Sequence, residues 1–165
     1  MKGLTYGGII IDLGSGAGIP SCFFLEERRD VQFVLFDLSI RMLKLATPFD
    51  KKVVGRAEEL PFDDSTFDLV VCAFSFHHFS DQKKAMDEIR RVIRPKGKLY
   101  LLEIDPRSKL GSFIFRLESL IGSEVLPVFP DRIKKIAQEL GFFVRIQSYG
   151  WRYSLVGDFR SYKIN

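Results

Sequence analysis

Cysteine and histidine are scarce in this chain of 165 residues, which has two of each. Cys22 and Cys72 lie far apart, each in an apolar stretch, so we expect buried free thiols rather than a disulfide framework. The N-terminal segment is too short and too polar for an export signal. Together these features predict a cytoplasmic protein.

Long apolar runs and a strong excess of one charge are also missing. Lys and Arg number 25 against 21 Asp and Glu, a net charge of +4. The basic residues form small groups beside acidic ones, such as Arg90-Arg91, which is typical of solvated helix faces and not of a nucleic-acid-binding stripe. The longest apolar runs, such as Leu69 to Phe76, fall far below the ~18 residues that span a bilayer. We therefore expect neither a membrane nor a nucleic acid as partner.

Short apolar β-strand patterns alternate with helical patterns along the chain. Strands are expected at 8–13, 31–36, 52–54, 67–73 and 99–104, and helices at 19–28, 39–46 and 82–93. A further helix (131–140) precedes two strand patterns, 142–146 and 151–156, which have no helix between them and so should pair antiparallel. This order predicts an α/β fold: a doubly wound, mostly parallel seven-stranded sheet with an antiparallel C-terminal strand. We expect one domain over 1–165, with a cofactor-binding core at 8–104 and the ligand at the carboxyl ends of the strands.

Residues 105–130 interrupt this alternation and carry an apolar stripe at helical spacing: Leu110, Phe113, Ile114, Leu117 and Ile121. Such a stripe can pack into the core, form a lid over an apolar acceptor, or be the interface of a homodimer. Only about seven residues precede the first strand. We therefore expect the cover of the substrate site to come from this segment or from another chain.

A glycine-rich loop, Asp12-Leu13-Gly14-Ser15-Gly16-Ala17-Gly18, follows the first strand pattern. Its spacing is not the G-x-G-x-x-G of dinucleotide folds, whose third glycine would fall at Ile19. The carboxylate of Asp12 would repel a pyrophosphate but attract the ammonium of an amino-acid tail. S-adenosylmethionine (SAM) has such a tail and no phosphate. Asp37 ends the second strand, about 20 residues on, where an acid accepts hydrogen bonds from ribose hydroxyls.

Three further stretches complete the pattern: Gly55 to Val71, Phe74 to Phe79, and Glu88 to Pro95 with Gly97. Together with the glycine loop, they make the chain from about Ile9 to Ile104 resemble the class I SAM-dependent methyltransferases. Within that class it is similar to the UbiE-like (methyltransferase type 11) group of mainly small-molecule enzymes. The resemblance implies methyl transfer from SAM to a small-molecule acceptor, which leaves S-adenosylhomocysteine (SAH) as product.

The resemblance also implies which residues bind the cofactor. The methionine part would be held by Asp12 and the loop residues Gly14, Ser15, Gly16 and Ala17. Asp37 would hold the ribose, and the adenine would lie near Leu38, Arg56, Ala57 and Glu58. Ala73 and Phe74 would border the sulfonium. Where this group usually has an acid, the chain has Arg56, which has no acceptor atom; Arg56 would stack on the adenine, or Glu58 would accept from its amino group.

His77 and His78 lie just beyond the fourth strand and are candidate general bases for an acceptor that must lose a proton. Tyr6 is a further candidate, and a structural role in the loop is the alternative for both histidines. We expect no metal, because two adjacent histidines without nearby Cys or acidic partners do not form a ligand set. Alternative functions are a non-catalytic SAM- or SAH-binding protein, a methyltransferase acting on nucleic acid or protein, and a nicotinamide oxidoreductase.

Overall fold

The computed structural model describes residues 7–22 and 30–159. Its strands are β1 (Ile9–Leu13), β2 (Gln32–Asp37), β3 (Lys51–Val54), β4 (Phe67–Ala73), β5 (Ile93–Ile104), β6 (Phe142–Tyr149) and β7 (Arg152–Phe159). Its helices are α2 (Ile40–Leu45), α3 (Gln82–Val92), α4 (Lys109–Leu120) and α5 (Pro130–Glu139), with a 3₁₀ turn, η1 (Phe76–His78). Residues 19–22 are helical, and the rest of the helix expected to 28 lies outside the described residues, as does Tyr6.

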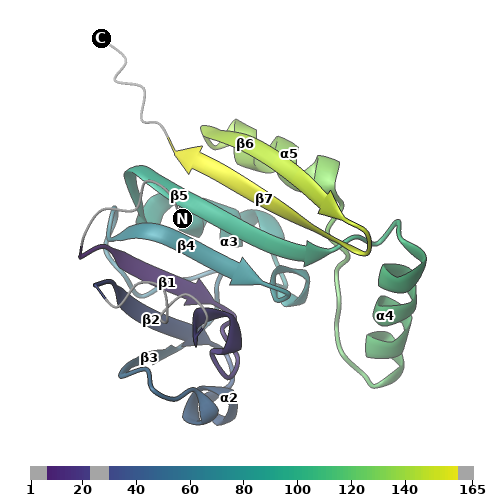
Figure 1. Ribbon diagram of the computed structural model, residues 1–165, viewed down its shortest axis with the longest axis horizontal. Helices are drawn as coiled ribbons and strands as arrows, with labels where there is room; N and C mark the ends of the chain where they lie inside the picture. The colour runs from purple at the N-terminus through teal and green to yellow at the C-terminus, as the bar shows by residue number, and fades with distance from the viewer. Residues whose placement is uncertain (1–6, 23–29, 160–165) are drawn as a thin grey trace.

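All seven strands form one twisted sheet in the order β3-β2-β1-β4-β5-β7-β6 (Figure 1). The pairs from β3 to β5 are parallel, whereas β7 runs antiparallel to both β5 and β6. This arrangement confirms the α/β fold with a mostly parallel sheet and an antiparallel C-terminal strand. From β1 the sheet grows first toward β2 and β3 on one side and then toward β4 and β5 on the other. The carboxyl ends of β1 and β4 therefore form the switch point where ligands bind in such folds.

The central strands are covered on both faces, as their near-continuous apolar sequences require. Alternate residues of β1 enter two separate hydrophobic clusters: Ile11 packs in the larger cluster with α3 and α5, and Ile10 packs in the smaller one with α2. The apolar face of α3 is fully buried, including Ala85 and Ile89. These clusters hold the carboxyl ends of β1, β2 and β4 in fixed positions.

The fifth strand begins earlier than expected. The helix and turn predicted around Pro95 place its start at residue 99, but β5 begins at Ile93, directly after α3. Ile93 pairs with Phe67, and the register then shifts before Lys98 pairs with Leu69. Lys96 takes a positive φ of 70° within this irregular stretch. The strand therefore accommodates the proline and glycine as a bulge.

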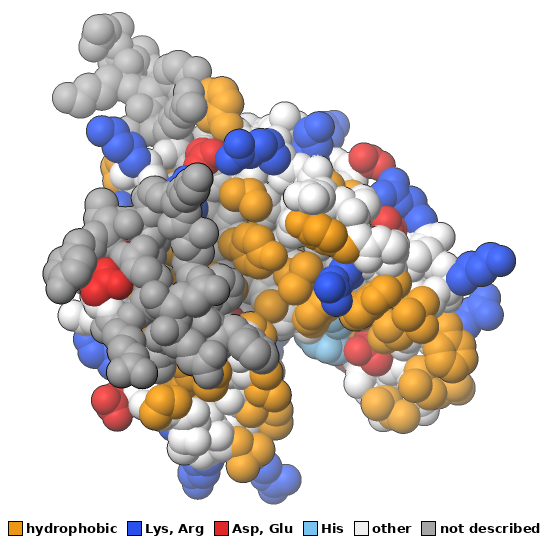
Figure 2. Space-filling view, viewed as in Figure 1, with side chains coloured by type: hydrophobic (Ala, Val, Ile, Leu, Met, Phe, Trp, Pro, Cys, Tyr) orange, Lys and Arg blue, Asp and Glu red, His pale blue; other side chains and the backbone are white. Residues whose placement is uncertain are grey.

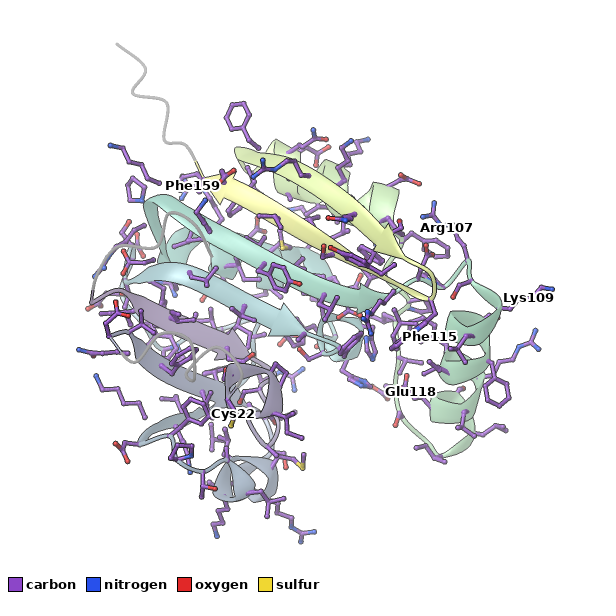
Figure 3. All side chains as sticks on the ribbon, in the orientation of Figure 1. Cys22, Arg107, Lys109, Phe115, Glu118 and Phe159 are labelled. Carbon is purple, nitrogen blue, oxygen red and sulfur yellow. The ribbon has the colours of Figure 1, made fainter. Side chains whose placement is uncertain are left out.

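The apolar stripe of residues 105–130 does not pack into the core. On α4, Phe113 is 61% exposed and Leu117 is 51% exposed, whereas Phe115, just off the stripe, is buried. Figure 1 shows α4 standing apart from the rest of the sheet's cover, and Figure 2 shows apolar side chains on its surface. Core packing of the stripe is thus the wrong interpretation, because the buried residues of α4 are Gly111 and Phe115, which lie outside the stripe. Phe115 and Glu118 point from α4 toward the end of the sheet (Figure 3).

Both cysteines are free, Cys72 fully buried and Cys22 partly so. Their Sγ atoms lie near polar atoms: Cys72 Sγ is 3.0 Å from the hydroxyl of Ser75, and Cys22 Sγ is 3.7 Å from the carbonyl of Thr47. Burial raises the pKa of the Cys72 thiol. Among the described residues, no helix combines the length and the apolar character needed to cross a membrane.

Candidate cofactor and acceptor site

The glycine loop turns back on itself directly after β1. Gly14, Gly16 and Gly18 have φ values of 65°, 55° and 74°, which side-chain-bearing residues rarely adopt. The amide of Gly14 donates to the carbonyl of Phe36 at 2.8 Å, which ties the loop to the end of β2. A side chain at Gly14 would collide with Ser75. The loop therefore needs glycine both for its conformation and for its close approach to the segment after β4.

Asp37 joins the glycine loop to the start of α2. One carboxylate oxygen accepts from the amide of Gly16 at 2.8 Å, and the other accepts from the amide of Ser39 at 2.7 Å. Ser39 in turn caps α2 by accepting from the amide of Met42. A carboxylate has about four acceptor positions, so each oxygen of Asp37 retains capacity for a further donor, such as a ribose hydroxyl.

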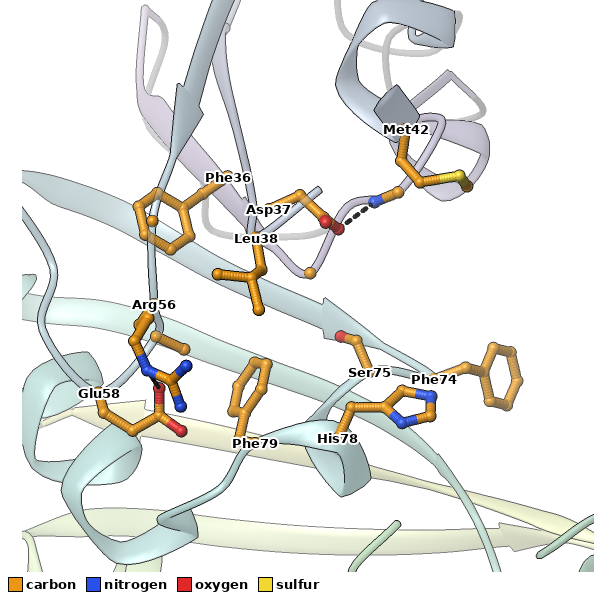
Figure 4. Close-up of a pocket in the computed structure, with 14 residues that line it drawn as sticks. Phe36, Asp37, Leu38, Met42, Arg56, Glu58, Phe74, Ser75, His78 and Phe79 are labelled. Carbon is orange, nitrogen blue, oxygen red and sulfur yellow. Dashed lines mark hydrogen bonds and ion pairs between the residues drawn. The ribbon is translucent and has the colours of Figure 1, made fainter. Parts of the chain in front are cut away.

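A pocket of about 380 Å³ opens at the carboxyl ends of β1, β2 and β4 (Figure 4). Nine of the residues predicted for the site line it: Gly14, Gly16, Asp37, Leu38, Arg56, Ala57, Glu58, Phe74 and His78. Five predicted residues are not part of its lining: Asp12, Ser15, Ala17, Ala73 and His77. Its wall also contains Phe36, Met42, Gly55, Ser75 and Phe79, which sequence reasoning did not assign to the site.

Asp12 lies beneath the glycine loop and is only 1% exposed. Its carboxylate accepts from the hydroxyl of Ser21 at 2.6 Å. Burial raises its pKa to about 7, the Ser21 hydrogen bond opposes this, and the negative charge of Asp37 adds to the rise. Its contact with an amino-acid tail stays a prediction. Nearby, the hydroxyl of Ser15 is buried and has no partner among the described residues, so a ligand could supply one.

Arg56 and Glu58 form the corner of the pocket opposite the glycine loop. Arg56 donates to the hydroxyl of Ser80 at 2.6 Å, and its Nε lies 3.7 Å from Glu58. Glu58 also accepts from the amide and hydroxyl of Ser80 at 2.7 and 2.8 Å and from the amide of Asp81 at 3.2 Å. Burial alone would raise the pKa of Glu58, but these hydrogen bonds outweigh it and lower the pKa. Both predicted adenine contacts therefore involve side chains that already bind each other.

The segment that carries this corner is anchored to α3 by Arg91. Its guanidinium donates to the carbonyls of Phe62 and Leu60 at 2.7 and 2.9 Å, and Glu88 accepts from the amide of Leu60 at 2.7 Å. Glu88 also holds Arg91 at 2.8 Å. The sequence predicted that Arg91 lies on an ordinary solvated helix face. It instead links α3 to the pocket wall.

Phe74 follows β4 in a left-handed conformation, with φ of 53°. For a bulky residue this conformation is strained, and it directs the ring against Trp151, with centroids 5.8 Å apart and planes 14° from parallel. Trp151 lies at the turn between β6 and β7. Sequence reasoning missed this aromatic pair because the two residues are distant in the chain and meet only through the β5–β7 pairing.

The two histidines have different environments. His78 is exposed and lines the pocket. His77 is 1% exposed, and its Nδ1 lies 2.7 Å from Glu103, whose other oxygen accepts from the amide of Phe76 at 2.8 Å. Its Nε2 lies 3.8 Å from Glu118 on α4. The premise that the histidines lack acidic partners is thus wrong, because β5 and α4 bring two carboxylates to them.

Comparison with known proteins identifies the family. Residues 11–101 match the family described as "Methyltransferase domain". The chain is 35% identical over 163 residues to demethylmenaquinone methyltransferase of Thermotoga maritima, an alignment that covers 84% of this chain and 71% of that protein. It is 32% identical over 112 residues to the ubiquinone/menaquinone biosynthesis C-methyltransferase UbiE of Idiomarina loihiensis, covering 62% of this chain.

The chain spans 45% of the length of that UbiE protein. The fold matches the crystal structure of YcgJ from Bacillus subtilis with a TM-score of 0.80 at 19% identity, over 96% of this chain and 94% of that one. The topology and the sequence relationships agree with the expectation from the glycine loop and the motifs that follow it. The chain therefore belongs to the methyltransferase domain family, as a class I SAM-dependent methyltransferase of the UbiE-like group.

Proposed function

We propose that the chain holds SAM in the pocket beside the glycine loop and transfers its methyl group in line to an apolar small-molecule acceptor, leaving SAH. The observation that carries this proposal is the carboxylate of Asp37, which lies on the pocket wall and is oriented by two backbone amides. The volume of about 380 Å³ falls in the range of small-molecule sites, roughly 300–1,000 Å³. The buried, unpartnered hydroxyl of Ser15 supports a polar ligand at the loop.

When bound, SAM supplies a methyl group already activated by the sulfonium. The chain must orient both reactants and exclude water. Asp37 would hold the ribose, the loop amides would face the methionine part, and Arg56 with Glu58 would border the adenine. Phe74, held by Trp151, would form the wall nearest the sulfonium. Alignment of this kind contributes roughly 7–11 kcal/mol to lowering a two-reactant barrier.

Apolar surface beside the pocket supports an apolar acceptor. Ile40, Met42 and Leu45 of α2 are 51%, 40% and 66% exposed. Figure 2 shows a hollow with apolar side chains on α2 at one side and on α4 at the other. Apolar side chains gathered beside a pocket favour a binding site for an apolar ligand. The names of the relatives, demethylmenaquinone methyltransferase and UbiE, agree with a small, apolar acceptor.

If the acceptor must lose a proton, His78 is the proposed base, because it reaches the pocket. His77 lies behind it and is held by Glu103. His77 would act through its neighbour as a positioning residue. A Glu103→Gln variant would weaken that hold and should shift the pH profile of methyl transfer, while SAH affinity stays the same.

Titration calorimetry with SAH and with NAD tests cofactor binding in wild-type protein and in Asp37→Ala. Hydrogen bonds to a charged group contribute about 1.5–3 kcal/mol each, so the loss of two to the ribose should weaken SAH binding by more than about 100-fold. Asp50→Ala removes an exposed acid outside the pocket lining and should leave SAH affinity unchanged. Equal affinity for SAH in Asp37→Ala and wild type, or a preference for NAD, would contradict the proposal.

Transfer itself is tested by release of SAH on incubation with SAM and apolar small molecules, demethylated quinones among them. A Phe113→Ser, Leu117→Ser double variant should raise the KM for the acceptor and leave SAH affinity unchanged, since α4 does not contribute to the pocket lining. SAH binding without turnover on any acceptor would favour a non-catalytic binding protein.

A further inference from the structure

Two buried polar atoms near the pocket have no hydrogen-bond partner among the described residues. They are Nε2 of His77 and one carboxylate oxygen of Glu118, and they face each other at 3.8 Å. Buried polar atoms in folded proteins are almost always paired, so an unpaired donor or acceptor calls for an explanation. Here two such atoms from different elements, η1 and α4, border the same small space.

His78 adds a third potential ligand to this space. Ligand atoms of His77, His78 and Glu118 all lie within 4.8 Å of one another. The two imidazole rings are in contact, with centroids 4.2 Å apart. Figure 3 shows Glu118 reaching from α4 toward the body of the protein, and the histidine surface lies in the hollow of Figure 2. Two imidazoles and one carboxylate thus converge on one point.

The orientation of His77 suits metal binding. Its Nδ1 lies 2.7 Å from a carboxylate oxygen of Glu103, an acceptor, so the proton of a neutral ring is placed on Nδ1. Glu103 is itself held by the amides of Phe76 and Ile104 at 2.8 and 3.3 Å. Nε2 then carries a lone pair and lies 3.8 Å from a carboxylate oxygen of Glu118. A carboxylate behind a histidine ligand is the common outer partner in protein metal sites, where it orients the ring and raises its basicity.

We propose that His77, His78 and Glu118 form a binding site for one divalent transition-metal ion of the Zn²⁺ type. Two histidines and one carboxylate are a known three-ligand set for Zn²⁺, which leaves one position open. Imidazole ligands favour such ions over Mg²⁺ and Ca²⁺, which prefer oxygen. Bonds of about 2.0–2.1 Å in a tetrahedron separate ligand atoms by roughly 3.3 Å, so the 3.8 Å between His77 and Glu118 needs only slight closure, and the exposed His78 side chain can adjust.

The ion would lie at the edge of the pocket, because His78 is part of the pocket wall. The open position would then accept an oxygen from the pocket side, and the ion would lower the pKa of a hydroxyl bound there. In the loaded protein, His78 serves as a ligand and does not act as a base. The three ligands belong to η1 and α4 and not to the glycine loop or to β2, so metal binding can be measured in the absence of SAM.

A proton is the competing explanation. A doubly protonated His77 between Glu103 and Glu118 would also place positive charge in this space. Its Nε2–H would then donate to Glu118, but 3.8 Å is too long for a hydrogen bond. The two explanations predict different results in a metal titration, because a doubly protonated His77 paired with the two carboxylates would give no saturable uptake of metal.

The test uses the purified, untagged chain after treatment with a chelator. Zn²⁺ is titrated by calorimetry, and Co²⁺ is titrated by visible absorption, which reports the geometry of the ligands without any activity measurement. We expect one ion per chain, a tetrahedral Co²⁺ spectrum, and displacement of Co²⁺ by Zn²⁺. SAH affinity of the chelator-treated chain is measured in parallel, so that failure of the metal site is distinguishable from failure of cofactor binding.

Variants then locate the site. Glu118→Gln and His78→Gln change partly or fully exposed side chains and should fold normally. Each should weaken Zn²⁺ binding by more than the roughly 10–100-fold that loss of an outer partner costs. Glu139→Gln on α5 removes the same charge from a distant, exposed position and is the matched control. No saturable Zn²⁺ uptake, or equal affinity in Glu118→Gln and Glu139→Gln, would overturn the proposal.

Discussion

The pocket, called here the cofactor side after its proposed role, and the region beside it that η1, the end of β5 and α4 form, called here the acceptor side, are held together in opposite ways. On the cofactor side, the segments after β1, β2, β3 and η1 are joined by short hydrogen bonds. Asp37 accepts from Gly16 and Ser39, and Glu58 accepts from Ser80. On the acceptor side, the buried residues of α4 are Gly111 and Phe115, and unpaired atoms of His77 and Glu118 lie 3.8 Å apart. The difference indicates that the cofactor side is preformed, whereas the acceptor side is completed by what binds to it.

The two sides also differ in the chain segments that form them. The cofactor side is assembled from three short stretches that each directly follow a strand of the parallel sheet. The acceptor side depends on η1, β5 and α4, and α4 belongs to the segment that breaks the regular alternation. Residues on the acceptor side can therefore be replaced without disturbing the cofactor side, as expected where loops carry function on a rigid scaffold.

The largest expected effect comes from Asp12, whose buried carboxyl costs stability when it ionises. Its pKa is about 7 in the folded chain against an ordinary value of 3.8, so the folded state retains a proton that the unfolded state releases between these values. Stability should therefore fall as pH rises from 4 to 7 and level off above 7. Asp12→Asn should remove that decrease, on the order of 4 kcal/mol for a rise of about three pKa units at about 1.4 kcal/mol per unit.

Urea unfolding at pH 4.5 and pH 8 measures this change, taken as the difference between the two pH values within each protein. That comparison cancels any constant cost of the buried amide in Asp12→Asn. Asp50→Asn replaces an exposed acid and should keep the wild-type dependence. If the free energy of unfolding depends equally on pH in wild type and Asp12→Asn, ionisation of Asp12 does not lower the stability of the folded chain.

A smaller effect is expected from Phe115→Ala on the acceptor side. The ring is 7% exposed and packs edge-on against His77 at 5.4 Å. Its loss should cost about 3 kcal/mol, the low end for a buried Phe, because the site lies at the edge of the core. If the attachment of α4 depends on this ring, amide exchange in Lys109–Leu120 should speed by about 100-fold while exchange in β1 is unchanged.

Phe113→Ala is the matched control, since this ring of the same helix is 61% exposed. Exposed substitutions usually stay within about 0.5 kcal/mol. Equal exchange rates in α4 for both variants would show that α4 is held by contacts other than Phe115. That result would remove the contrast between the cofactor side and the acceptor side.

The smallest effect is expected from Arg56→Ala. The Arg56 side chain is 55% exposed and its ion pair with Glu58 spans 3.7 Å, so the pair itself adds at most about 1 kcal/mol. Stacking of the guanidinium on an adenine would add about 0.5–1 kcal/mol, which predicts a two- to five-fold loss of SAH affinity by calorimetry. A loss above tenfold would instead make Arg56 a principal adenine contact, and no loss would leave the adenine to Glu58.

The parts of the fold and site that the sequence predicted share one property: each is encoded in a short stretch. The strand patterns and the glycine loop depend on neighbouring residues, and parallel strands bring their carboxyl ends to one edge. Asp37 and the glycine loop could therefore be placed beside the same pocket from the order of the residues alone. Arg56 and Glu58 followed from their position in the motif, but their mutual pairing through Ser80 did not.

Local residue patterns predicted the strands and the mostly parallel direction of their pairing, and they placed the glycine loop and Asp37 at one edge of the sheet. The other cofactor contacts were implied by the resemblance to the family. Tertiary structure alone decided which face of α4 turns inward, which acids meet His77, and that Phe74 stacks on Trp151. The physical reason is that these contacts join segments far apart in the chain, whose approach depends on the packing of β5, β7 and α4. A spacing rule describes what one helix or strand can present, but it does not identify the residue that will face it.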